Sequence, residues 1–461
     1  MKYRWLQTTY REKKIAQTKG EGVSRPDEGQ ENQAVNLYPD FQYQVFEGFG
    51  GSMTEAAAYT WHTMSEKTRG ELLQACFGAE GLGYNQARMS IDSCDAGLGN
   101  YSAMEDEQDK EMKSFSLKRD EKYILPFWEA AQKVSDAPIE VMLSPWSPPP
   151  FMKTNGEKNH GGKLKDEYRE MWAEYFCRYV EAYREKGVTV KRISIQNEPA
   201  AVQIWDSCVY TAGEEKAFLR DYLYPALERH GLTDLEIFIW DHNKERLLER
   251  AMETIDQDTD GMIAGIAFHW YSGDHFEALK LAHERYPDKK LLFSEGCVEY
   301  SKFAEKDQLA DARMYGHDIV GDLNGGACAY ISWCLLLNDM GGPNHVNNFV
   351  DAPVMYDEKT DSMEKKLSYY YIGHFSRSIV PGSVRIGFSK YTDGLDVTAF
   401  LRPDGKIVVV LMNRTEKKMP VFLRLKGEVL PVAVDGDAIM TVWIDFTYAL
   451  TDTPPHKTHR R

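Results

Sequence analysis

The sequence predicts an α/β fold, a (β/α)8 TIM barrel with an antiparallel β-sandwich side domain. Three observations predict it. From Phe46 onward, short apolar runs alternate with amphipathic stretches, as in repeated βα units around a parallel sheet. After about Tyr371, short alternating runs are separated by turn residues, as in antiparallel sheets. The 461 residues suffice for one large domain and one small one, so we expect a barrel at 41–375 and the β domain at 1–40 and 376–461.

The apolar runs of the barrel region number eight, which is the strand count of a closed (β/α)8 barrel. Their expected ends, in chain order, are Phe49–Gly51, Met89–Ile91, Met142–Ser144, Ile195–Asn197, Ile239–Asp241, Phe268–Trp270, Phe293–Glu295 and Ile331–Trp333. Helical stretches lie between them. Glu167–Lys186 ends at Gly187, and Glu214–Glu228 begins after Thr211 and ends near Gly231.

The two ends of the chain are expected to share one sheet. The pattern Val397–Phe400, Pro403–Gly405, Ile407–Leu411 is typical of two strands joined by a tight turn. The segment 1–40 lacks a helical period, so we expect its ends to add strands to the carboxy-terminal sheet. Its polar middle, residues 17–34, is either part of that arrangement or disordered.

The composition excludes several classes of protein. No apolar run approaches the roughly 20 residues that a membrane span needs. The formal net charge of −16 disfavours nucleic acids and anionic membranes, because both are bound by clustered Lys and Arg. A small, neutral substrate is the simplest match.

The cysteines predict a reducing compartment. The seven cysteines are scattered without CxxC pairs, and Cys94, Cys328 and Cys334 lie in element patterns where they read as small buried hydrophobes. The first eleven residues contain too many polar side chains for the apolar core of a signal peptide. We therefore expect a cytoplasmic protein.

Two strand-like runs lead into a glutamate. Glu198 follows the fourth predicted strand and Glu295 ends the seventh. The carboxyl ends of all barrel strands open on one mouth, so the two carboxylates are expected to share a cleft. A single Glu at a strand end is usually a solvated side chain. Two such carboxylates in one cleft are what glycosidic bond cleavage requires.

Other polar and aromatic residues are expected at the same mouth. They offer hydrogen-bonding groups and rings, as recognition of a polyhydroxyl compound requires. They are Asp95, Trp146, Asn197, His269, Tyr271, Trp333 and Asn348. Because the residue before a proline avoids the helical region, Pro199 is expected to hold Glu198 in an extended backbone conformation.

A series of short motifs runs through the barrel region in chain order. They are Gly48–Ala56, Ser93–Asp95, Ser144–Pro149, Lys153–Gly156, Gln196–Pro199, His269–Tyr271, Gly341–Asn344, Asn348–Asp351 and Gly373–Ser376. Together they resemble the family 30 glycoside hydrolases, the group that includes glucosylceramidase. The resemblance spans the barrel and continues towards the side domain.

The resemblance implies a retaining hydrolase of β-glycosides. We expect it to use no metal and no other cofactor. In it, Glu295 is similar to the nucleophile and Glu198 to the acid/base. Tyr271 looks like the tyrosine that hydrogen-bonds the nucleophile, Asn197 would hold the sugar 2-hydroxyl, and Arg88 would support the carboxylates from beneath. We expect Glu198 to be protonated before the first step and Glu295 to be ionised.

The same resemblance leaves the substrate open in part. Asp95, Trp146, Trp333 and Asn348 would line the pocket for the remaining sugar hydroxyls. A carboxylate beside Trp146 favours glucose over xylose, since it would pair with hydroxyls that xylose partly lacks. His345 stands where the glucosylceramidase-like motif usually has Trp, and Asn347 replaces a basic residue, so the leaving-group side is expected to differ.

Several alternatives remain at this point. A β-1,6-glucanase or gentiobiase, or a β-xylosidase or β-fucosidase, would use the same catalytic residues. The presence of both glutamates argues against a non-catalytic sugar-binding barrel. A metal-dependent barrel hydrolase would have to use His160, Asp241, His242 and His269, whose spacing matches no metal motif.

Overall fold

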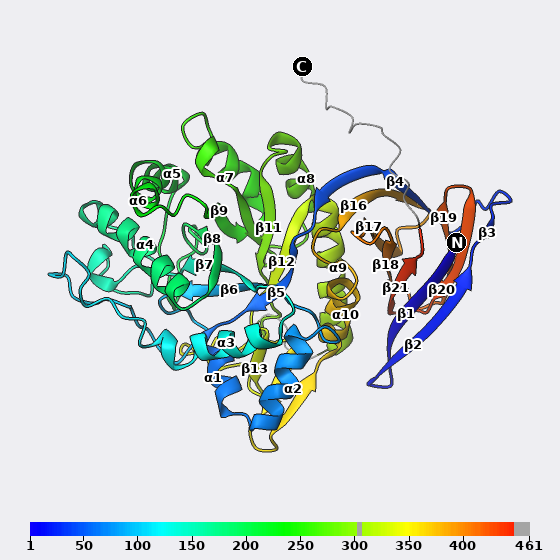
Figure 1. Ribbon diagram of the computed structural model, residues 1–461, viewed down its shortest axis with the longest axis horizontal. Helices are drawn as coiled ribbons and strands as arrows, with labels where there is room; N and C mark the ends of the chain where they lie inside the picture. The colour runs from blue at the N-terminus through cyan, green and yellow to red at the C-terminus, as the bar shows by residue number, and fades with distance from the viewer. Residues whose placement is uncertain (302–306, 447–461) are drawn as a thin grey trace. The chain divides into compact units, whose positions relative to one another are not determined.

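The computed structural model describes residues 1–301 and 307–446, which fall into two compact units (Figure 1). Of the described residues, one unit comprises those of 46–381, and the other comprises residues 1–45 and 382–446. The expected boundaries, 40/41 and 375/376, lie a few residues earlier. Strand β4 runs without a break to Val45, and helix α10 ends only at Ser376.

The larger unit is a closed barrel of eight parallel strands, as predicted. Its strands, in chain order, are β5 (Gly48–Ser52), β6 (Gln86–Ile91), β7 (Glu140–Pro145), β8 (Thr189–Ser194), β9 (Glu236–Asn243), β10 (Gly265–His269), β11 (Lys290–Glu295) and β12 (Ala327–Ser332). Every neighbouring pair is parallel, and β12 pairs with β5 to close the barrel. Buried apolar residues of β7, β9, β10, β11 and β12 form one cluster within it.

Helices surround the barrel strands (Figure 1). They are α1 (Glu55–Thr63), α2 (Glu66–Phe77), α3 (Ile124–Val134), α4 (Arg169–Glu185), α5 (Ala212–Phe218), α6 (Tyr224–His230), α7 (Leu247–Thr254), α8 (Phe276–Arg285), α9 (Gln308–Gly325) and α10 (Leu367–Ser376). A short sheet of β13 (Leu336–Asn338), β14 (Val354–Asp357) and β15 (Ser362–Lys365) precedes α10. Among the described residues, no helix has the length and apolar character needed to cross a bilayer.

The helix predicted at 214–228 is interrupted. It begins as expected at the N-cap Thr211, whose side chain accepts from the Glu214 amide while the Glu214 carboxylate accepts from the Thr211 amide. A π-helical turn at Leu219–Leu223 then separates α5 from α6. Pro225 has no N–H to donate to the preceding turn, which accounts for the wider turn there. Gly231 ends α6 with a left-handed φ of 68°.

The smaller unit is a single ten-stranded sheet that takes strands from both ends of the chain. Its strands are β1 (Lys2–Arg11), β2 (Lys14–Val23), β3 (Arg25–Pro26), β4 (Ala34–Val45), β16 (Val384–Lys390), β17 (Leu395–Leu401), β18 (Ile407–Asn413), β19 (Met419–Leu425), β20 (Glu428–Val434) and β21 (Ala438–Ile444). Their order is β2-β1-β21-β18-β17-β16-β4-β19-β20-β3. The pairing is antiparallel except between β19 and β4, which are parallel.

The polar stretch at 17–34 is largely ordered β structure in this sheet. All ten residues of β2 pair with β1, and β1 pairs in turn with β21 near the other end of the chain. Most of β2 is exposed, which explains its polar composition. The buried faces of the sheet enclose one apolar core that includes Tyr3, Val35, Val409 and Val442.

Candidate active site

The two predicted glutamates line one pocket of about 170 Å³ at the carboxyl ends of the barrel strands. Glu295 is the last residue of β11, the seventh barrel strand, and Glu198 lies in the loop after β8, the fourth. Six of the other expected site residues line this pocket with them, whereas His269, expected to bind substrate, and Arg88 are fully buried and are not part of the lining. The full lining is Asp95, Trp146, Asn197, Glu198, Gln203, Trp205, His242, Asn243, Tyr271, Glu295, Cys297, Glu299, Trp333, Asn348 and Val350.

The backbone of Glu198 is not extended as expected from Pro199. Its φ is +46°, in the left-handed region. Tertiary hydrogen bonds set this conformation, because the Glu198 amide donates to the Asp241 carbonyl at 3.0 Å and the Asn197 amide to the Pro145 carbonyl at 2.8 Å. These bonds tie the loop to β7 and β9 and outweigh the local preference imposed by the proline.

Arg88 lies behind the pocket on β6 and is completely buried. Its guanidinium donates to Glu295 at 2.5 Å, to Asp241 at 2.7 Å and to the Asn197 side-chain oxygen at 2.8 Å. Its centre also lies 4.6 Å from the Trp146 ring centroid, within cation–π range. One cation therefore joins three strand ends, which is the supporting position expected for Arg88.

Glu295 is buried and receives two hydrogen bonds on different oxygens. Arg88 donates to Oε2 and the Tyr271 hydroxyl donates to Oε1 at 2.9 Å. The pKa of Glu295 is raised, because burial and the charge of Glu198 outweigh the opposing charges of His269 and Arg88. The two donors stabilise the ionised carboxylate, which is the form that a nucleophile needs.

Glu198 has a different environment, because it stands at the end of a hydrogen-bonded chain with His269 and Asp241. His269 Nδ1 lies 3.2 Å from Glu198 Oε1, and His269 Nε2 lies 3.1 Å from Asp241 Oδ1. Asp241 also accepts from the hydroxyls of Ser194 and Ser294, each at 2.6 Å.

The expected protonation of Glu198 is not what this environment favours in the free protein. Burial raises the pKa of Glu198, but the hydrogen bond from His269 and the charges of His242 and His269 lower it to about 2. Burial lowers the pKa of His269, but Glu295, Asp241 and Glu198 raise it to about 9. Because His269 is flanked by carboxylates, the proton resides on its imidazole, one hydrogen bond away from Glu198.

The opposite wall of the pocket combines rings with hydrogen-bonding groups. Trp146 and Trp333 are stacked, with ring centroids 5.2 Å apart. Asp95 accepts from the side-chain amides of Asn344 and Asn348 at 3.1 and 3.3 Å. Burial and the charge of Glu295 raise the pKa of Asp95 to about 7. This wall offers an apolar surface beside acceptors and donors, as a sugar ring with hydroxyl groups requires.

Sequence reasoning missed part of the site. Asp241 was considered only as a metal ligand, although it joins Arg88, His269 and two serines. His242 was likewise considered only as a metal ligand, and the residues of the lining that were not assigned are Gln203, Trp205, Asn243, Cys297, Glu299 and Val350. Asp241, His242 and Asn243 all follow the apolar run of the fifth strand, so an extension of the strand-end argument by a few residues would have found them. His160 pairs with Glu157 at the surface instead.

The family follows from the fold and the site together. A (β/α)8 barrel with two buried carboxylates, stacked tryptophans and an arginine brace in one pocket is the arrangement of a barrel glycoside hydrolase. The model of the glycosyl hydrolase family 30 TIM-barrel domain matches residues 46–379, and that of the family 30 beta sandwich domain matches residues 382–442. The chain belongs to glycoside hydrolase family 30.

Individual relatives support the same assignment. The chain is 34% identical over 410 residues to lysosomal acid glucosylceramidase of Mus musculus, covering 84% of this chain and 79% of that protein. It is 26% identical over 409 residues to endo-1,6-beta-D-glucanase neg1 of Aspergillus fumigatus, covering 83% of this chain and 81% of that protein. The crystal structure of SrfJ from Salmonella typhimurium superposes with a TM-score of 0.92 at 38% identity, covering 96% of this chain and 99% of that chain.

Proposed function

We propose that this glycoside hydrolase cleaves β-glucosides or short β-gluco-oligosaccharides with retention of anomeric configuration. The observation that carries the proposal is that Glu198 and Glu295 line one pocket and have different partners. Glu295 is held by a cation and a hydroxyl, whereas Glu198 contacts an imidazole. Paired carboxylates in distinct environments can take distinct roles in one reaction.

In the first step, Glu295 attacks the anomeric carbon and forms a glycosyl ester. The bond from the anomeric carbon to the leaving oxygen breaks, and the proton held by His269 passes through the Glu198 carboxyl to that oxygen. His269 stands behind Glu198, and Asp241 behind His269, so this chain fixes the Glu198 carboxyl and can return a proton to it. Asn197, held by Arg88, would bond the sugar 2-hydroxyl.

In the second step, Glu198 accepts a proton from water as that water attacks the anomeric carbon. The bond to Glu295 breaks, and its carboxylate leaves with a full negative charge. Arg88 and Tyr271 stabilise that charge through the hydrogen bonds they already make. The sugar is released with its original anomeric configuration.

The size of the pocket favours a single sugar ring at its base. A volume of about 170 Å³ is well below the ~300 Å³ lower end for drug-sized ligands. Asp95 and Asn348 would accept and donate hydrogen bonds to the outer hydroxyls of glucose, with Trp333 beneath the ring. We therefore propose exo action on a terminal β-glucosyl unit.

Hydrolysis of β-1,6-linked glucans is the second candidate, supported by the relative that is named an endo-1,6-beta-D-glucanase. The leaving-group side carries the departures from the glucosylceramidase-like motif. His345 lies 3.4 Å from Asp206, and its amide donates to the Asp95 carbonyl. Asn347 has a left-handed φ of +61°. We propose that the segment with His345 and Asn347 determines which aglycone the enzyme accepts.

A panel of aryl β-glycosides that differ only in the sugar tests the substrate. We expect the β-D-glucoside to be cleaved faster than the β-D-xyloside or β-D-fucoside. Gentiobiose and glucosylceramide then separate the two candidate leaving groups. If every β-D-glucoside stays intact while a xyloside or fucoside is cleaved, the assignment of glucose is wrong.

We also propose that the protein works in the cytoplasm. All seven cysteines are buried free thiols, and a reducing compartment keeps thiols in that form. Fractionation of the native host followed by immunodetection tests this. Recovery of the protein outside the cytoplasmic fraction would refute it.

A further inference from the structure

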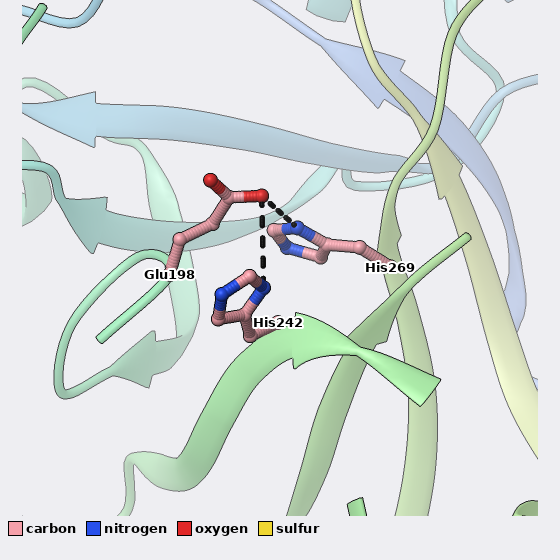
Figure 2. A group of neighbouring side chains, drawn as sticks. All are labelled: Glu198, His242 and His269. Carbon is pink, nitrogen blue, oxygen red and sulfur yellow. Dashed lines mark hydrogen bonds and ion pairs between the residues drawn. The ribbon is translucent and has the colours of Figure 1, made fainter. Parts of the chain in front are cut away.

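Three side chains beside the proposed acid/base form a group of metal-ligand type. Glu198, His242 and His269 each offer one ligand atom, and these atoms lie within 4.8 Å of one another. His269 Nδ1 is 3.2 Å and His242 Nδ1 is 3.8 Å from Glu198 Oε1. Figure 2 shows both imidazoles directed at the same carboxylate oxygen. Among the residues that the structure describes, no other group of three or more His, Cys, Asp or Glu side chains brings its ligand atoms this close together.

Neighbouring residues hold two of these ligands in place. His269 Nε2 contacts Asp241, and a carboxylate on the far nitrogen of a histidine is the usual support of a metal ligand. Asp241 is itself fixed by Arg88 at 2.7 Å. The ring of Trp240 stacks on His242, with centroids 5.0 Å apart. The group is therefore positioned before any ion arrives.

His242 is the ligand that the protein leaves unsatisfied. Its Nδ1 is buried and has no hydrogen-bond partner among the described residues. Glu198 Oε1, at 3.8 Å, is beyond hydrogen-bonding distance. A buried polar atom without a partner is uncommon and calls for an occupant. An ion between His242, His269 and Glu198 would satisfy it.

The ligand set selects the kind of ion. Two imidazoles and one carboxylate with an open fourth position form a familiar zinc site, whereas magnesium and calcium prefer oxygen ligands. Bonds of about 2.0–2.2 Å in a tetrahedral site place ligand atoms about 3.3 Å apart. The observed 3.2 and 3.8 Å are close to that spacing, so small side-chain rotations would complete the site.

We propose that Glu198, His242 and His269 bind a divalent zinc ion that inhibits the enzyme reversibly. The inference rests on the proposed role of Glu198 as acid/base. Zinc takes up the lone pairs of Glu198 and displaces the proton of His269, so no proton can pass to the leaving oxygen. The fourth position faces the pocket and would hold water.

Isothermal titration of the metal-free enzyme with zinc chloride tests the binding directly. We expect one saturable site in the wild type and an affinity at least about tenfold weaker in His242→Asn. His230→Asn is the matched control, because His230 lies on α6 beside two surface carboxylates, Glu174 and Glu181. It should bind zinc as the wild type does, and magnesium chloride should not compete.

Absence of saturable zinc binding to the wild type, or equal affinity in His242→Asn, would overturn the proposal. Circular dichroism verifies that the variant is folded, and His242→Gln replaces it if it is not. Hydrolysis of an aryl β-glucoside, compared with and without zinc for each variant, gives the second readout. Inhibition should follow the binding curve and be reversed by a chelator. Failure to hydrolyse any β-glycoside would count against the proposed function, and the calorimetric result would still stand.

Discussion

At the scale of single residues, the site is organised by charges that are buried together. Arg88 is inaccessible to solvent yet contacts Glu295, Asp241 and Asn197, which come from three different strand ends. Removing one partner of a buried ion pair leaves an uncompensated buried charge, which strongly destabilises the folded protein. The carboxylates and the cation therefore fix one another's positions, and the roles we propose for Glu198 and Glu295 differ because their remaining partners differ.

Removal of the Tyr271 hydroxyl tests the proposed support of the nucleophile. In Tyr271→Phe, Glu295 loses a hydrogen bond of 2.9 Å that would also stabilise its charge as it leaves. We expect kcat to fall about 10- to 100-fold, since a hydrogen bond to a charged group is worth ~1.5–3 kcal/mol. Steady-state kinetics with an aryl β-glucoside measure this. Tyr300→Phe, which removes a hydroxyl bonded to Asp351, is the control, and equal losses in both variants would contradict the assignment.

Replacement of Glu198 separates the roles of the two carboxylates. Glu198→Gln cannot donate a proton, so glycosides with poor leaving groups should lose far more activity than activated aryl glycosides. Glu295→Gln should lose activity on both kinds of glycoside, by more than about a thousandfold, since no glycosyl ester can form. Rate constants across a series of aryl glucosides of different leaving-group pKa measure this. If the rate constants of Glu198→Gln depend on the leaving-group pKa as those of the wild type do, Glu198 is not the acid.

Titration of Asp95 should appear in substrate binding. Its pKa of about 7 means that the carboxylate forms as the pH rises through neutrality. An ionised acceptor binds sugar hydroxyls more strongly, so a non-hydrolysable thioglucoside should bind roughly five- to tenfold tighter at pH 8 than at pH 6. Calorimetry on the wild type and on Asp95→Asn measures this. A pH dependence that persists unchanged in Asp95→Asn would show that another group is responsible.

At the scale of elements, one irregular strand shapes the site. Ala267 of β10 pairs with Trp240 of β9 and Phe268 pairs with His242, so Asp241 is the extra residue of a β-bulge. Trp240 and Asp241 have φ values of +72° and +48°. The bulge directs Asp241 towards Arg88 and His269. Glu215 on α5 secures it, because its carboxylate accepts from the Trp240 amide at 3.0 Å.

Glu215→Ala tests whether this bulge positions the catalytic chain. Without the acceptor, Asp241 and His269 should lose their alignment, and kcat should fall about tenfold with a smaller change in KM. Glu249→Ala, which removes an exposed carboxylate on α7, is the control. A lower melting temperature with kcat unchanged would assign Glu215 a structural role only.

The strand ends could be predicted from the sequence, but their irregularities could not. Apolar runs bounded by polar residues located all eight barrel strands, and with them Glu198 and Glu295, whereas Arg88 was expected only from the family resemblance. The left-handed backbone of Glu198 depends on its bond to the Asp241 carbonyl, a contact between residues far apart in the chain. The lowered pKa of Glu198 likewise depends on His269, whose own pKa is raised by Glu295 and Asp241. Such coupled effects leave no signal in local patterning.

At the scale of the whole molecule, both ends of the chain are needed for the β unit. Strand β1 is hydrogen-bonded to β21 over Tyr3–Thr9 and Ala438–Ile444. The polar segment after it is ordered because it pairs with β1, which no local property of residues 17–34 could show. In the barrel unit, buried polar groups away from the site carry stability as well. Asp120, for example, accepts from the hydroxyls of Tyr101, Tyr179 and Tyr183.

Asp120 should make the stability of the protein depend on pH. Burial raises its pKa to about 7. Because the folded state binds this proton more tightly than the unfolded chain, its contribution is complete below about pH 4 and is lost as the pH rises through about 7. Asp120→Asn should therefore show a smaller fall in melting temperature between pH 5 and pH 8 than the wild type.

Differential scanning calorimetry at several pH values measures this, with the exposed Asp136→Asn as the control. The control should retain the wild-type dependence on pH. An equally steep decline in Asp120→Asn would mean that Asp120 titrates normally in the folded protein.

Mass spectrometry of the enzyme treated with a 2-deoxy-2-fluoro-β-glucosyl fluoride tests whether Glu295 is the nucleophile of a retaining reaction. The fluorine slows both steps, and the good leaving group lets the glycosyl ester accumulate. We expect a mass increase of one fluoroglucosyl group per chain, carried by the peptide that contains Glu295, with concurrent loss of activity. A label on another residue, or inactivation without any covalent adduct together with product of inverted configuration, would contradict it.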